Sequence, residues 1–159
     1  MRTLLIALLL FAVGPVLAAS GDPLVSRMDV FRIVAGDDGR ERAEPASETL
    51  PGEVLEYRLS YQNVSEAPLR ALVITGPIPD NTDYVADSDA TMVVADLRVS
   101  IDGGGSYEPE PVIRERTLAD GSVEEYVVPP AQYTHVRWRS ETPIAPGTTQ
   151  AFRYRVIVE

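Results

Sequence analysis

The sequence predicts an all-β protein made of antiparallel sheets. In short segments along most of the chain, apolar residues alternate with polar ones, as expected for strands with one buried face. The 13 prolines are spread along the chain, and proline interrupts helices. After the first 19 residues, no segment of about 11 or more residues has the apolar period of an amphipathic helix. These observations exclude a predominantly helical fold.

Residues 1–19 have the pattern of a secretory signal peptide. Arg2 gives a short positive start, an apolar run follows, and a Gly-Pro pair precedes small residues at the cleavage position. The run is shorter than the roughly 20 residues that a membrane-spanning helix needs. We therefore expect removal of the leader and export to the periplasm or cell surface, without a transmembrane segment. The remaining residues 20–159 have the length of one domain.

The first strand is expected at residues 27–34, where a Gly-Asp-Asp-Gly turn follows. The acidic and polar segment 35–50 is expected to be an exposed loop. A Pro-Gly turn then leads into the clearest strand of the chain, at 54–62. Its aromatic and aliphatic residues fall on one face with strict period 2. They are Leu55, Tyr57, Leu59 and Tyr61.

Shorter strands are expected in the middle of the chain, separated by Pro, Gly and Asp. They are 69–75, 84–86, 92–101, 111–114 and 123–128. Three consecutive glycines predict a hairpin tip over 102–106, because glycine adopts positive φ without strain. A second turn is expected at Asp120-Gly121-Ser122.

The last two strands are expected at 133–140 and 149–158, joined by a short link. In the second of them, Phe152, Tyr154, Val156 and Val158 fall on one face. Trp138 is expected in the core, since a β-sandwich needs a bulky central side chain. Seven to nine short strands with this spacing favour an immunoglobulin-like two-sheet antiparallel β-sandwich. A closed barrel is the alternative.

The composition excludes several kinds of site. The chain has no Cys, so zinc-thiolate sites and thiol nucleophiles are excluded, and all 14 basic residues are Arg, so lysine chemistry is excluded too. Without its leader the chain has 13 basic and 24 acidic residues, a formal charge of −11. That charge argues against nucleic-acid or anionic-membrane binding and favours solubility or a cationic partner. We expect no cofactor.

Motifs across residues 50–158 resemble the bacterial conserved-repeat domain family (domain of unknown function eleven). Residues 50–63 look like its opening, a Pro-Gly turn before an alternating strand that ends in Asn. Residues 73–79 resemble its next strand and proline-bracketed turn, and 138–156 its closing strand pair. The chain departs from the pattern at Gly76, where the family usually has Asp. The resemblance implies an exported envelope or surface β-sandwich, here in single copy, and brings no catalytic residues.

The candidate binding residues lie on the last two expected strands. If these strands pair, as their short link suggests, their polar faces form one surface with a positive field. Its members are Tyr133, His135, Arg137, Arg139, Arg153 and Arg155. Because Arg binds carboxylates and phosphates with two parallel hydrogen bonds, this surface is a candidate docking face for an acidic protein, an anionic glycan or a lipid headgroup. The alternative, which the sequence favours, is that acids such as Glu56 and Glu141 neutralise it by cross-strand pairing.

The acidic residues of the chain offer two alternative functions, a calcium site and a periplasmic hydrolase. Four acids fall close together but lack the spacing of an EF-hand loop. They are Asp80, Asp83, Asp87 and Asp89. For a hydrolase, Glu108 and Glu110 could pair, whereas the adjacent Glu124 and Glu125 point to opposite faces of a strand. Ser106 lacks the second glycine of a nucleophile elbow. The sequence therefore predicts a non-catalytic binding or structural module.

Overall fold

The computed structural model describes residues 21–159, whose regular structure is β apart from one 3-10 turn, η1 (Pro130–Gln132). The strands are β1 (Leu24–Ala35), β2 (Glu41–Pro45), β3 (Val54–Asn63), β4 (Val73–Pro77), β5 (Thr82–Tyr84), β6 (Ala90–Thr91), β7 (Ala95–Ser100), β8 (Ile113–Thr117), β9 (Val123–Val127), β10 (His135–Ser140) and β11 (Thr149–Val158). The all-β prediction is confirmed, with eleven strands instead of seven to nine. The leader expected at 1–19 lies outside the described residues.

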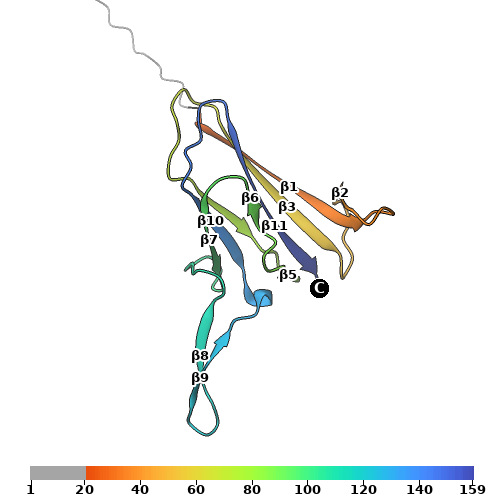
Figure 1. Cartoon of the computed structure of the whole chain (residues 1–159), viewed down its shortest axis with the longest axis vertical. Coiled ribbons are helices and arrows are strands. Elements are labelled where there is room, and N and C mark those ends of the chain that lie inside the picture. Colours follow the sequence, from red (N-terminus) through yellow and green to blue (C-terminus); the bar gives the residue numbers. More distant parts are fainter. Residues whose placement is uncertain (1–20) are drawn as a thin grey trace, which may run out of the picture.

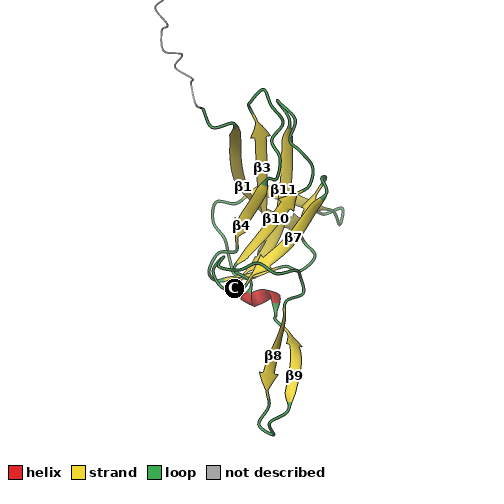
Figure 2. Cartoon of the chain, turned by 90° about the vertical axis from the view of Figure 1, so that its left-hand side faces the viewer, coloured by secondary structure: helices red, strands yellow, loops and turns green. Residues whose placement is uncertain are grey.

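The strands form three antiparallel sheets (Figure 2). The large sheet has the order β2-β1-β3-β11-β5, with β6 also paired to β11. The small sheet has the order β4-β10-β7, and β8 pairs with β9. Figure 1 shows the β8–β9 hairpin projecting from one end of the body, opposite the end where β1 begins. Within residues 21–159, none of the helical structure has the length and apolar character needed to cross a membrane.

The core lies between the large and the small sheet. Leu59 of β3 lies opposite Phe152 of β11, and Tyr57 opposite Tyr154. From the small sheet, the Trp138 ring lies 5.5 Å from Phe152 and 6.0 Å from Tyr154, measured between ring centroids. The predicted inward faces of these strands and the core position of Trp138 are confirmed. An apolar side chain buried in this way contributes about 1.5–3 kcal/mol.

Gly76 on β4 makes room for Tyr154. A Cβ placed on this glycine would lie 2.6 Å from Tyr154 Cε1. The Tyr154 hydroxyl also donates a hydrogen bond to the carbonyl of Pro77, so the ring is fixed against the same strand. This contact explains why a glycine follows Thr75.

We expect Gly76→Ala to lower the free energy of unfolding by about 1–3 kcal/mol, because overpacking displaces the Tyr154 ring. The measurement is urea denaturation followed by tryptophan fluorescence. Gly21→Ala is the control, since a Cβ on Gly21 meets nothing within 4 Å. Equal midpoints for the two variants would contradict the prediction.

The segment 35–50, expected to be a polar loop, contains strand β2. Its five residues pair with β1, from Phe31 opposite Pro45 to Ala35 opposite Glu41. All five are exposed, so neither face of β2 has the apolar alternation that identifies a strand in a sequence. The loop prediction was wrong at these five positions for that reason. β2 forms an edge of the large sheet, and its charged side chains disfavour pairing with other chains.

Candidate binding face

The outward face of the small sheet carries three of the six predicted binding residues. Val136 and Trp138 of β10 are buried, so the residues that alternate with them point away from the core. Across β7, β10 and β4 the outward rows are Arg98–Arg137–Thr75, Asp96–Arg139–Val73 and Ser100–His135–Pro77. The set Arg98, His135, Arg137 and Arg139 is named the arginine face.

Arg137 is held by two neutral partners. Its guanidinium carbon lies 3.3 Å from the centroid of the Tyr107 ring, a cation–π contact. Its Nε donates to Thr75 Oγ1 over 3.3 Å. Arg137 forms no ion pair with any residue of 21–159. The Arg137 side chain is therefore held in one orientation by neutral groups, and no anion of the described chain neutralises its charge.

The other two guanidinium groups differ in their partners. Arg98 Nε donates to Asp96 Oδ2 over 2.8 Å on the same strand. Arg139 is exposed, and its side chain has no ion pair or hydrogen bond within the described chain. Three guanidinium groups thus share this surface with one carboxylate. The result is a local positive field on an acidic protein, suited to bidentate binding of a carboxylate.

His135 lies at the end of the arginine face, beside the loop 102–106. Its Nδ1 is 3.2 Å from Thr134 Oγ1. Gly104 lies next to the imidazole, since a Cβ on it would be 3.6 Å from the ring. The chain reverses here as predicted: the backbones of Val99 and Glu108 exchange two hydrogen bonds of 2.9 Å.

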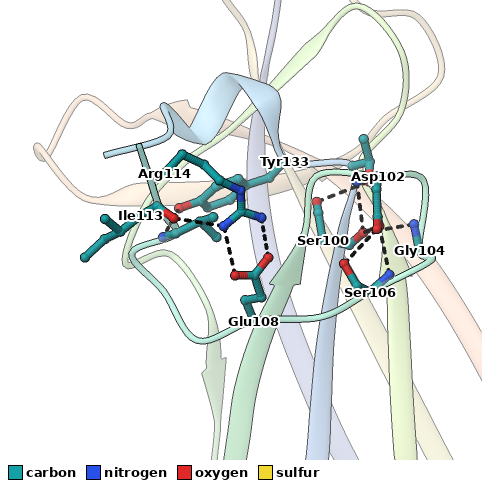
Figure 3. Close-up of polar contacts among 10 residues, drawn as sticks. Ser100, Asp102, Gly104, Ser106, Glu108, Ile113, Arg114 and Tyr133 are labelled. Carbon is teal, nitrogen blue, oxygen red and sulfur yellow. Dashed lines mark hydrogen bonds and ion pairs between the residues drawn. The ribbon is translucent and has the colours of Figure 1, made fainter. Parts of the chain in front are cut away.

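The carboxylate of Asp102 in this loop forms its hydrogen bonds with neighbouring residues of the chain (Figure 3). Asp102 accepts hydrogen bonds from the Ser106 hydroxyl at 2.7 Å, the Ser106 amide at 2.9 Å and the Ser100 hydroxyl at 2.7 Å. These bonds hold the pKa of Asp102 well below its usual value. Ser106, considered above as a nucleophile, is thus a donor to a carboxylate, and Asp102 forms no ion pair with the arginine face within residues 21–159.

Tyr133 does not belong to the arginine face, contrary to the prediction. It is 3% exposed, and its ring centroid lies 5.8 Å from that of Tyr84 in the core. Its hydroxyl accepts a hydrogen bond from the Val112 amide over 3.4 Å. The prediction failed because η1 directly precedes Tyr133 and β10 begins only at His135. The period of 2 therefore does not extend back to residue 133.

β10 and β11 do not pair, so Arg153 and Arg155 are not on the arginine face either. β11 belongs to the large sheet, and these two arginines lie on its outward face. The link between the strands crosses from one sheet to the other. The buried Asn63 side chain fixes this crossing by donating to the Ile144 carbonyl over 2.9 Å. A short link here joins two layers instead of two neighbours in one sheet.

Acids pair with Arg153 and Arg155, as the alternative interpretation held: Glu56 with both, and Glu41 with Arg155 at 2.7 Å. The Glu56 side chain is 1% exposed, with Oε2 2.9 Å from Arg155 Nε and 3.7 Å from Arg153 Nη1. Arg58 Nε donates to Oε1 over 2.7 Å. Burial raises the pKa of Glu56, but hydrogen bonds from Arg58 and Arg155 outweigh it and lower the pKa. Glu141, the other acid considered, forms no ion pair among the described residues.

The acidic residues predicted as candidates for calcium binding or hydrolysis do not all lie together. Within residues 21–159, no three Asp, Glu or His side chains are gathered closely enough to hold a metal ion. Asp87, Asp89 and Glu110 line a cavity of about 500 Å³ at the base of the β8–β9 hairpin. Burial, with Asp87 and Asp89 nearby, raises the pKa of Glu110. Its expected partner Glu108 is instead paired with Arg114 (Figure 3).

Sequence reasoning missed two residues of this surface, Arg98 and Tyr107. The outward direction of the Arg98 side chain was predictable from the sequence, because Arg98 falls between the apolar Leu97 and Val99 in an expected strand. Its position beside Arg137 was not predictable, because that position depends on which strand pairs with β10. Tyr107 follows the glycine-rich loop, and no pattern in the sequence indicates that it stacks on Arg137.

The resemblance to the conserved-repeat family stays a prediction that rests on the motifs in residues 50–158. No protein-family model, curated protein or solved structure matches this chain.

Proposed function

We propose that this protein is an exported, immunoglobulin-like β-sandwich that acts as a non-catalytic binding module of the bacterial envelope or cell surface. Two antiparallel sheets with a shared core support the sandwich. The leader pattern at 1–19 supports export. The arginine face supports binding, and its ligand is the carboxylate group of an acidic protein.

One observation carries the binding function: Arg137 and Arg139 are neighbouring cations that form no ion pair within residues 21–159, and the one carboxylate of this face, Asp96, pairs with Arg98. Of the 13 Arg in residues 21–159, nine form ion pairs within the chain. The four that do not are Arg40, Arg70, Arg137 and Arg139. The last two share one face of β10, two residues apart. In a chain rich in carboxylates, this pair is open to a carboxylate from outside.

The surroundings of the pair favour a protein ligand. Stacking on Tyr107 restricts Arg137 before binding, so little side-chain entropy is lost when a ligand arrives. Val73, 49% exposed, lies beside Arg139 in the register and offers an apolar contact. An acidic protein surface can supply both a carboxylate and an apolar side chain. An anionic glycan supplies a carboxylate but no aliphatic side chain.

The test is binding of poly-L-glutamate and of polygalacturonate to immobilised mature protein at low ionic strength. We expect R137E/R139E to weaken poly-L-glutamate binding about tenfold or more, because each charge-assisted hydrogen bond contributes about 1.5–3 kcal/mol. R40E/R70E is the matched control, with the same change of charge at unpaired arginines elsewhere.

Equal losses in the two variants would show attraction by overall charge and contradict a specific face. Binding of neither polymer would contradict the proposed function. Binding of polygalacturonate alone would replace the protein ligand with a glycan.

A further inference from the structure

The β8–β9 hairpin stands apart from both larger sheets. β8 and β9 pair with each other and with no other strand of the described chain. Figures 1 and 2 both show the hairpin projecting along the long axis of the molecule. It is anchored at its base, where the Val128 amide donates to the Val112 carbonyl over 2.8 Å and both side chains are buried. The remainder of the hairpin extends into solvent.

One face of the hairpin has all its charges paired. The register places Arg114 opposite Tyr126 and Arg116 opposite Glu124. Arg116 forms an ion pair with Glu124, and its guanidinium lies 5.5 Å from the Tyr126 ring centroid. Arg114 forms an ion pair with Glu108 of the body. This face is internally matched and needs no partner.

The opposite face has unmatched charges between exposed apolar residues. Its cross-strand pairs are Ile113–Val127, Glu115–Glu125 and Thr117–Val123. Neither Glu115 nor Glu125 forms an ion pair or a side-chain hydrogen bond within residues 21–159. Ile113, Val127 and Val123 are 51%, 57% and 61% exposed. These six residues are named the carboxylate face of the hairpin.

The carboxylate face is unfavourable as a free surface. Like charges directly opposite each other destabilise a pair of strands. A two-stranded hairpin is marginal in water unless its apolar side packs on something. Both costs disappear if a cation inserts between Glu115 and Glu125 while apolar groups cover Ile113, Val123 and Val127. The chemistry of the face therefore favours a partner with cationic side chains beside an apolar one.

Among the described residues, the arginine face with Val73 has those properties, and its Arg137 and Arg139 have no ion pair within residues 21–159. We propose that the carboxylate face of the hairpin docks on the arginine face of a second copy of this protein. This inference rests on the proposed function and names the partner of the same site. The hairpin points away from its own small sheet (Figure 2), so the contact joins two molecules.

The spacing of the charged groups is compatible with this contact. Opposed residues of a hairpin have Cβ atoms about 4.5–5.5 Å apart, which sets the separation of Glu115 and Glu125. Residues two apart on a strand are about 7 Å apart, which sets the separation of Arg137 and Arg139. The lengths of the Glu and Arg side chains accommodate the difference. Because the contact joins two different surfaces, it repeats head to tail and builds a chain unless the geometry closes a ring.

The test is sedimentation velocity of the mature protein over a range of concentrations, with charge reversals on each side. We expect the wild type to form concentration-dependent chains. E115R/E125R and R137E/R139E should each raise the dissociation constant on the order of 100-fold, because like charges then meet at the contact. An equimolar mixture of the two variants should associate again, since each supplies the charge that the other lacks.

E48R/E66R is the control for the hairpin variant, with the same change of charge at exposed acids elsewhere. Circular dichroism checks that each variant is folded, and the mixture shows directly that both variants keep functional surfaces. A wild type that stays monomeric at millimolar concentration would overturn self-docking, while poly-L-glutamate binding would still report on the proposed function. Association that survives E115R/E125R, or variants that fail to associate when mixed, would also overturn it.

Discussion

Glu56→Gln is expected to lower the free energy of unfolding by about 3–5 kcal/mol, because it removes one charge from a buried ionic cluster. The Glu56 side chain is 1% exposed and is surrounded by Arg58, Arg153 and Arg155. Without the Glu56 carboxylate, Arg58 and Arg153 lose their ion-pair partner among residues 21–159, while Arg155 keeps Glu41. The measurement is urea denaturation at pH 7. Glu141→Gln is the control, since Glu141 is exposed and forms no ion pair in the described chain.

The same cluster gives a pH dependence. The pKa of Glu56 in the fold lies below its ordinary value of 4.5, because hydrogen bonds from Arg58 and Arg155 outweigh its burial. The unfolded chain therefore binds this proton more readily than the folded one. The contribution of Glu56 is complete above pH 4.5 and is lost as the pH falls through the folded pKa. Glu56→Gln should flatten the pH dependence of stability in this acidic range, and an unchanged slope would contradict the assignment.

Trp138→Ala is expected to cost about 3–5 kcal/mol, since it empties the space between the two sheets. The indole packs on both Phe152 and Tyr154 of the facing sheet. Trp138→Phe should cost less than half as much, because the indole Nε1 is buried without a hydrogen-bond partner among residues 21–159. Phenylalanine therefore loses volume but no hydrogen bond.

The measurement for both Trp138 variants is urea unfolding followed by circular dichroism, since their tryptophan signal is lost. Equal destabilisation by Ala and Phe would contradict this prediction.

The direction of side chains was predictable from the sequence, whereas the partners of strands were not. Alternation in β3 and β11 is a property of each strand alone, so the inward positions of Tyr57 and Phe152 followed from period 2. Which strand lies next to β10 depends on the whole chain. For that reason Arg137 and Arg139 were assigned to the correct outward face, but Arg153 and Arg155 were grouped with them wrongly.

Short or fully exposed strands were also not predictable from the sequence. β2 has no buried face, and β5 and β6 have three and two residues, too few to show a period. Tyr133 was misplaced because one 3-10 turn shifts the start of β10. The burial of the Glu56 carboxylate was equally unpredictable. Its place in the alternation indicates an outward position, and it is buried because arginines from both β3 and β11 pair with it.

The hairpin and the start of β1 lie at opposite ends of the molecule (Figure 1). A molecule held on a solid support by its amino-terminal end would therefore present the tip at Asp120-Gly121-Ser122 farthest from that support. The tip would be the first point of encounter for anything approaching from solution.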